Sequence, residues 1–124
     1  MGPEKSFETK VKKFLSEQGI YPLGIEKQKI TAMPIGYWEK RFANRNTKSG
    51  LPDMHICIYG HSIEVELKRQ NGKPSDLQIK MCQQIIDSEG IAFILYPSGF
   101  ETFKEFIHNI VYDEYIEDLP LILK

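Results

Sequence analysis

Apolar residues recur at helical spacing in three segments of the chain. Ser75 and Gln78 form a candidate capping box before the second segment, and Ser98 and Glu101 form another before the third. A glycine follows each of the first two segments and favours the end of a helix there. The pattern predicts helices over residues 6–18 and 76–89 and a final helix that starts at 98.

Strand patterns lie between these helices. Residues 53–58 and 63–68 alternate apolar and polar positions, and residues 91–96 form the continuous apolar run of a strand buried on both faces. Residues 20–50 contain one or two further strands, interrupted by a proline and a glycine. The order of elements predicts an α/β domain with a central mixed sheet flanked by helices, in which the strand–helix–strand passage ending at 91–96 is parallel and right-handed.

The two alternating strands are joined by YGHS, residues 59–62, where Gly60-His61 fits a two-residue type II′ turn. In that register one side of the hairpin is entirely apolar and packs on a helix. A slip of one residue would mix the apolar and polar sets, so the pattern itself favours this register. The polar side carries the facing pairs Asp53–Lys68, His55–Glu66 and Cys57–Glu64.

The polar side of this hairpin gathers candidate chemistry. Asp53 and Glu66 would be diagonal neighbours with Cβ atoms roughly 7–8 Å apart or less. Two such carboxylates can share a divalent cation, and Lys68 can stabilise negative charge or orient a water. The alternative is a solvated face with an Asp53–Lys68 ion pair worth about 0–1 kcal/mol. The buried run at 91–96 and the basic residues before Asp53 favour the functional interpretation.

Composition indicates an ordinary globular protein. The 124 residues are 41% hydrophobic and 27% charged, which favours one domain over 1–124. No apolar run approaches ~20 residues, and the first residues lack the apolar core of a signal peptide, so we expect a cytoplasmic protein with no membrane partner. Cys57 and Cys82 have no CxxC partner, so we expect two reduced, buried thiols rather than a zinc site.

Charge is unevenly spread although the net charge is only −1. Residues 27–50 hold six basic residues and one acid, and residues 112–120 hold four acids and no base. The asymmetry indicates a basic face for a polyanion, and an ordinary solvated surface explains it equally well.

Segment 50–96 resembles the VRR-NUC family, the virus-type replication-repair nucleases of the PD-(D/E)XK nuclease superfamily. Pro52-Asp53 matches the PD element, and Glu66-Leu67-Lys68, thirteen residues later, matches ExK. A glycine before the PD, the hairpin, a Gly-Lys-Pro-Ser turn and a helix that opens with a glutamine follow in the family's order. The likeness covers most of residues 6–107.

The resemblance implies a restriction-endonuclease-like core and phosphodiester hydrolysis that depends on Mg²⁺ or Mn²⁺. Asp53 and Glu66 would bind the metal, and the carbonyl of Leu67 would add a ligand. Lys68 would assist the attacking water and stabilise the charged transition state.

Three further residues have more than one possible role. By the resemblance, Glu8 contacts the metal through water or completes the acidic cluster; otherwise it is a solvated helix residue. Gln78 lines the site, or it only caps its helix. His55 is a general base, a metal ligand or a packing residue, and the resemblance gives it no role.

Small stand-alone members of this family look like phage-encoded homodimers that cut branched DNA, including four-way (Holliday) junctions. The sequence is therefore interpreted as a structure-selective DNA endonuclease in the cytoplasm of a phage-infected or bacterial cell. Residues 40–48 would hold the phosphate backbone, and Tyr37, Trp38 and Phe42 either stack on DNA or belong to the core. The tail LPLILK or the stretch 93–106 would form the dimer interface.

Two other functions remain open. The first is a catalytically inactive nucleic-acid-binding module of the same fold; the intact acid and lysine set argues against it. The second is an assembly protein that uses only its acidic tail, which leaves the pattern at 53–68 unexplained.

Overall fold

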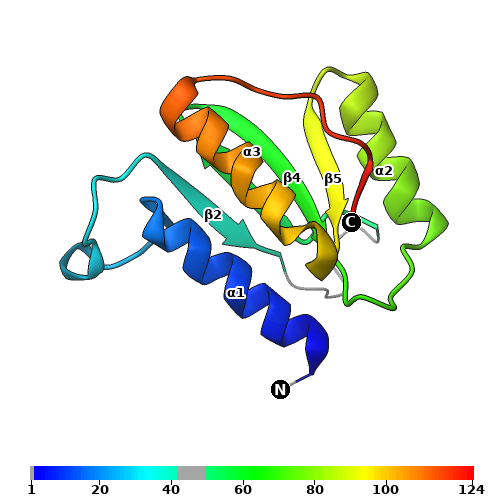
Figure 1. Ribbon diagram of the computed structural model, residues 1–124, viewed down its shortest axis with the longest axis horizontal. Coiled ribbons are helices and arrows are strands. Elements are labelled where there is room, and N and C mark those ends of the chain that lie inside the picture. The colour runs from blue at the N-terminus through cyan, green and yellow to red at the C-terminus, as the bar shows by residue number, and fades with distance from the viewer. Residues whose placement is uncertain (1, 42–49) are drawn as a thin grey trace.

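The structure is a computed structural model that describes residues 2–41 and 50–124 (Figure 1). It confirms a mixed α/β architecture with one six-stranded sheet. The helices are α1 Pro3–Glu17, α2 Asp76–Asp87 and α3 Phe100–Asp113, with short 3₁₀ turns η1 Lys27–Lys29 and η2 Pro97–Gly99. The strands are β1 Ile20–Pro22, β2 Gly36–Lys40, β3 Met54–Ile58, β4 His61–Leu67, β5 Ile91–Leu95 and β6 Ile122–Leu123.

The strands lie side by side in chain order, β1 to β6. β3 pairs antiparallel with both β2 and β4. The other neighbouring pairs, β1–β2, β4–β5 and β5–β6, are parallel. The passage from β4 through α2 to β5 is therefore parallel, as the sequence predicts. Because β4 and β5 run in the same direction, their carboxyl ends meet at one edge of the sheet.

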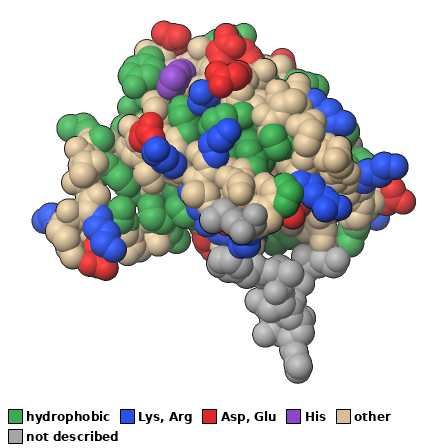
Figure 2. Space-filling model, turned by 60° about the horizontal axis from the view of Figure 1, so that its bottom comes forward, with side chains coloured by type: hydrophobic (Ala, Val, Ile, Leu, Met, Phe, Trp, Pro, Cys, Tyr) green, Lys and Arg blue, Asp and Glu red, His purple; other side chains and the backbone are tan. Residues whose placement is uncertain are grey.

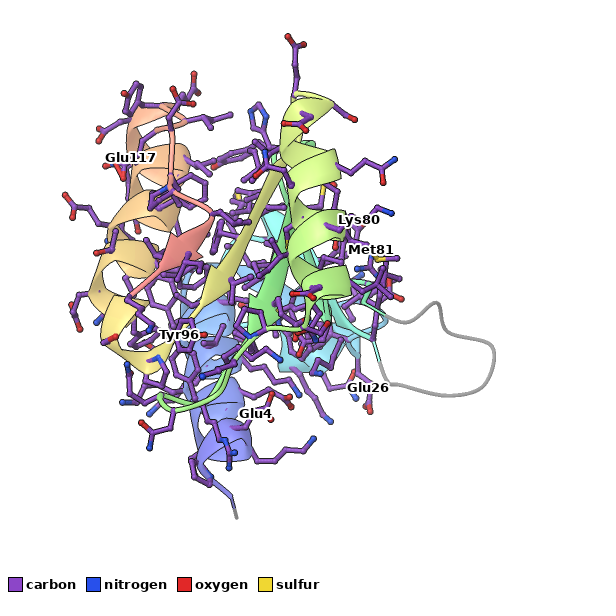
Figure 3. The ribbon with its side chains drawn as sticks, turned by 90° about the vertical axis from the view of Figure 1, so that its right-hand side faces the viewer. Glu4, Glu26, Lys80, Met81, Tyr96 and Glu117 are labelled. Carbon is purple, nitrogen blue, oxygen red and sulfur yellow. The ribbon has the colours of Figure 1, made fainter. Side chains whose placement is uncertain are left out.

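Helices cover both faces of the sheet. α1 and α3 pack together on one face, and α2 packs on the other (Figures 1 and 3). β5 shows why its sequence is apolar throughout: Phe93 and Leu95 belong to the core under α1 and α3, and Ala92 and Ile94 belong to the core under α2. The expected doubly buried strand is confirmed.

The register of the β3–β4 hairpin differs from the predicted one by two residues. Met54 pairs with Val65, and Ile58 pairs with His61. The turn residues are Tyr59 and Gly60, with φ of 48° and 85°, which is the pattern of a type I′ turn rather than type II′. Since side chains alternate with a period of two, a two-residue shift leaves the apolar and polar faces as predicted but changes which residues oppose each other.

The two predicted capping boxes have different outcomes. Ser75 and Gln78 form the box at the start of α2, where the Gln78 N–H donates to Ser75 Oγ at 3.1 Å and the Ser75 N–H donates to Gln78 Oε1 at 2.8 Å. The box at Ser98 is wrong, because α3 starts after Gly99. The Ser98 N–H and Oγ instead bond the side-chain amide of Gln70, which ties the turn after β4 to the start of α3.

The C-terminal residues form a strand of the chain's own sheet. Ile94 N–H donates to Leu121 O at 2.8 Å, and Tyr96 N–H donates to Leu123 O at 3.0 Å. Leu123 is only 3% exposed. Its carbonyl lies so close to Gly99 that a Cβ there would be 2.3 Å from the oxygen, so only glycine fits. Of the tail residues expected at a dimer interface, Leu123 is thus buried in the chain's own core, whereas Ile122 is 40% exposed.

The remaining expectations about burial are partly met. In the stretch 93–106, Phe93, Phe103 and Phe106 are fully buried, so these rings cannot form an interface. Cys82 is a buried free thiol as expected, whereas Cys57 is free but only half-buried. Across residues 2–41 and 50–124, no helix has both the length and the apolar character needed to cross a bilayer.

Candidate functional site

The three motif residues meet at the edge of the sheet where β4 and β5 end. Asp53 directly precedes β3. Glu66 is the second-to-last residue of β4, and Lys68 directly follows that strand. One step beyond the Met54–Val65 pair, the observed register puts Asp53 opposite Glu66 rather than diagonal to it. The Leu67 N–H donates to Asp53 Oδ1 at 3.2 Å, and the Lys68 N–H donates to Leu95 O at 3.0 Å. Backbone hydrogen bonds therefore fix both sides of the site.

The chain reaches Asp53 through a close approach to α2. Gly50 has φ of 84°, and a Cβ there would lie 2.5 Å from Cγ of Leu77 in the first turn of α2. A glycine at this position lets the segment before β3 pass beneath the helix that also carries Gln78. The turn after β4 is held from the other side, where the Tyr96 hydroxyl (Figure 3) donates to Gly72 O at 2.8 Å.

Glu66 is a buried carboxylate with one oxygen in use. The residue is only 4% exposed. Oε2 accepts a hydrogen bond from Gln78 Nε2 at 3.0 Å and lies 3.5 Å from Lys68 Nζ. Oε1 is buried and has no hydrogen-bond partner in the described part of the chain. Burial, with the Asp53 charge as a second cause, raises the pKa of Glu66 to about 7.

Gln78 performs both of its candidate roles at once. Its backbone N–H and Oε1 complete the capping box with Ser75, and its Nε2 donates to Glu66. The two interpretations of the sequence are therefore compatible, because the amide uses different atoms for the cap and for the site.

Glu8 is connected to the motif residues by Lys40. Lys40 Nζ lies 3.5 Å from Glu8 Oε1 and 3.4 Å from Asp53 Oδ2. Glu8 is 6% exposed, so the alternative of a solvated helix residue is wrong. Burial would raise the pKa of Glu8, but the hydrogen bond from Lys12 and the charge of Lys40 outweigh it and lower that pKa. For Asp53 burial prevails over Lys40 and raises the pKa.

From the sequence alone, Lys40 is one residue of a basic stretch, with no sign that it belongs to the site. It lies in β2 opposite Met54, so the strand carries its side chain to the α1 side, next to Asp53. A lysine at the end of a strand gives no local signal of its partners, because these come from α1 and from the start of β3.

A second polar cluster stands beside the site. Arg41 binds Glu64 through both guanidinium nitrogens, at 2.5 and 3.0 Å, and also donates to Pro52 O at 2.8 Å. His55 Nδ1 lies 2.8 Å from Glu64 Oε1. His55 therefore faces Glu64, and the predicted pairing with Glu66 is wrong because of the two-residue register shift. These contacts favour a packing and positioning role for His55.

The donor set suits some metal ions and not others. Within residues 2–41 and 50–124, no three His, Cys, Asp or Glu side chains form a group that could hold a metal. Asp53 and Glu66 supply two carboxylates, and Glu66 Oε1 is an acceptor without a donor. Mg²⁺ and similar hard cations bind through one or two carboxylates and complete their coordination with water and substrate phosphate. The residues fit such an ion and do not fit a closed structural zinc site.

The aromatic and basic residues expected to hold DNA are only partly described. Trp38 packs against the core, and Tyr37 lies over His55 with ring centroids 5.9 Å apart. Phe42, Arg45 and Lys48 lie outside the described residues. Figure 2 shows Lys and Arg side chains spread over the end of the molecule at which α1 begins, not gathered in one patch. The face drawn in Figure 2 thus shows no single basic patch.

A cavity of about 650 Å³ lies elsewhere, around His61, Gly90 and Leu119. It borders the start of β4, whereas the acidic site borders its end, about 20 Å away at ~3.3 Å per residue. The cavity and the Asp53–Glu66 site are therefore separate features, and the candidate site is the edge of the sheet at Asp53 and Glu66.

No protein-family model, curated protein or solved structure matches this chain. The function is therefore inferred from the site itself.

Proposed function

We propose that this chain is a DNA endonuclease that uses Mg²⁺ or Mn²⁺, with Asp53, Glu66 and Lys68 at its active site. The observation that carries the proposal is the unpartnered Oε1 of Glu66, buried opposite a second carboxylate. A buried acceptor without a partner costs about 1–3 kcal/mol, and more if charged. A cation shared with Asp53 would supply the missing partner. The PD and ExK elements and the sheet with helices on both faces are consistent with a restriction-endonuclease-like core of the VRR-NUC type.

The residues around the site prepare it for phosphodiester hydrolysis. A bound Mg²⁺ or Mn²⁺ would lower the pKa of a water and neutralise phosphate charge. Gln78 holds Oε2 of Glu66, which leaves Oε1 as the oxygen that a metal would take. Leu67 N–H orients Asp53, and the Leu67 carbonyl remains a proposed further ligand. Lys68 places a positive charge beside Glu66, where negative charge develops in the transition state.

A second candidate is a nucleic-acid-binding module of the same fold without catalysis. The ion pairs favour it, because Lys40 pairs with Asp53 and Glu8, and Lys68 pairs with Glu66. Such a network could be structural and need no metal. The two candidates differ in one property, since only the enzyme cuts DNA.

We propose branched DNA, including four-way junctions, as the preferred substrate, and a homodimer in the bacterial or phage-infected cytoplasm as the active form. Paired cuts on a two-fold symmetric junction require two active sites, which a symmetric dimer supplies. Phe93, Phe103, Phe106 and Leu123 do not support this idea, since they are buried within one chain, whereas Ile122 of the tail is exposed. The dimer surface is thus unassigned.

The test is incubation with labelled duplex, flap, fork and four-way-junction DNA in Mg²⁺, Mn²⁺, Ca²⁺ or EDTA. We expect cleavage in Mg²⁺ or Mn²⁺, strongest on the junction, and binding with little cleavage in Ca²⁺, whose looser coordination positions water poorly. Undiminished cleavage in EDTA would reject the metal mechanism. Binding without cleavage in every metal would support the inactive module instead.

A further inference from the structure

Lys40 is placed unlike an ordinary surface lysine. Its side chain is 13% exposed, and its Nζ lies between a carboxylate of α1 and the carboxylate before β3. Removing an ammonium group from water is expensive unless it is paired. Here the carboxylates of Glu8 and Asp53 offset that expense, and they come from two different layers of the fold. Lys40 Nζ also donates to Arg41 O at 3.4 Å.

The position of Lys40 relates it to metal binding. It faces Asp53 Oδ2, while the Leu67 N–H takes Oδ1. Both oxygens of Asp53 therefore have partners, whereas Glu66 keeps Oε1 without one. A cation that reaches Asp53 must approach a positive charge that already contacts one of its oxygens.

We propose that Lys40 is a positioning residue that acts as an internal cation: it joins Glu8 to Asp53 and weakens the site's affinity for a divalent metal. This inference rests on the proposed function, because it concerns the same metal site. It gives Glu8 an indirect role, which is to hold Lys40 at Asp53, in place of direct or water-mediated contact with the metal.

Two opposite effects follow from replacing Lys40 with the uncharged Met. Without metal, Glu8 and Asp53 lose a shared partner, so the melting temperature in EDTA should fall. With Mn²⁺, the repulsion between two cations is gone, so the metal should bind roughly three- to tenfold more tightly. A residue with a purely structural role would lower stability without tightening metal binding.

Lys12→Met is the matched control. Lys12 Nζ lies 2.9 Å from Glu8 Oε2, so this variant also removes a positive charge from Glu8. The described ion pair of Asp53 is with Lys40, and Lys12 is not among the charges that act on Asp53. Its Mn²⁺ affinity should stay within about twofold of the wild type, consistent with the weak coupling of distant charges.

If Lys40→Met fails to fold, the double variant Glu8→Gln/Lys40→Met keeps the test open. It removes both charges of one pair together, and replacing a whole buried pair is far less destabilising than removing one partner. We still expect tighter Mn²⁺ binding than in the wild type. If Glu8 instead bound the metal, the double variant would bind more weakly.

The experiment is calorimetric titration of the purified chain with Mn²⁺, without DNA, together with melting curves in EDTA and in Mn²⁺. Tighter binding in Lys40→Met and in the double variant supports the inference. Equal or weaker binding in these variants, with wild-type binding intact, overturns it and leaves the nuclease proposal standing. If neither the wild type nor any variant binds Mn²⁺, both this inference and the metal-dependent nuclease proposal are overturned. DNA cleavage is a separate readout that tests the proposed function alone.

Discussion

Gln78 Nε2 donates to Glu66 Oε2 at 3.0 Å, while Oε1 and the backbone N–H of Gln78 complete the capping box of α2. This contact joins the first turn of one helix to the end of β4. Because Oε2 accepts from Gln78, Oε1 is the oxygen of Glu66 that has no partner in the described part of the chain. The cap and the site can be separated by substitution.

Gln78→Glu should keep the cap and damage the site. Glutamate at this position also completes a capping box, so the start of α2 should keep its cap. The new carboxylate removes the donor to Glu66 and adds a like charge beside it, so cleavage should fall by about tenfold or more. Ser75→Ala is the control: it should lower stability by about 0.5–2 kcal/mol with a much smaller effect on cleavage. Equal effects of both variants on cleavage would contradict the prediction.

Asp53→Asn and Lys68→Met test the active site directly. Each should reduce cleavage by about 10²-fold or more while DNA binding in Ca²⁺ is retained, because binding depends mainly on dispersed positive charge. Single-turnover cleavage and gel-shift assays measure the two properties. A variant that cuts DNA at the wild-type rate would remove that residue from the proposed chemistry.

The faces of the elements could be predicted from the sequence, and their long-range partners could not. The alternation in 53–58 and 63–68 predicts which apolar side chains are buried, and the structure agrees, although Glu66 on the polar side is buried as well. The register could not be predicted, because a shift of two residues preserves this alternation. Tyrosine also rarely adopts the positive φ found at Tyr59, so nothing in the sequence indicates the turn there. Asp53 and Glu66 are still neighbours in the observed register, because a two-residue shift keeps the start of β3 beside the end of β4.

Lys40 and β6 show a different limit. The contacts of Lys40 with Glu8 and Asp53 join segments far apart in the sequence, and no local periodicity encodes them. β6 has two residues, too few for alternation to be recognised, so the sequence does not predict that the tail joins the sheet. Both features depend on tertiary packing.

The pKa of Glu66 predicts how stability varies with pH in EDTA. A carboxyl whose pKa rises from 4.5 in the unfolded chain to about 7 in the folded one binds more protons when folded. Its burial is therefore without penalty below pH 4.5, and stability is lost as the pH rises from 4.5 to about 7. The full loss is about 3 kcal/mol at ~1.36 kcal/mol for each pH unit between the two values.

Urea unfolding at pH 5 and pH 8 measures this loss. Glu66→Gln should reduce the difference between the two pH values, since the amide does not titrate. Added Mn²⁺ should also reduce it in the wild type, because a bound cation favours the charged carboxylate. An identical pH dependence in wild type and Glu66→Gln would show that another group is responsible.

The C-terminal strand gives a prediction that separates folding from assembly. Leu123 is 3% exposed and packs in the core, whereas its neighbour Ile122 is 40% exposed. Leu123→Ala should destabilise the chain by about 2–5 kcal/mol, the usual range for a buried leucine, and Ile122→Ala should cost much less. Deleting residues 119–124 removes the hydrogen bonds of β6 to β5 as well and should lower the melting temperature further. Denaturant unfolding and sedimentation of the same samples distinguish the two roles of the tail. If the truncated chain is as stable as the wild type but sediments as a smaller species, the tail serves the dimer; a less stable chain of unchanged oligomeric state is the expected result.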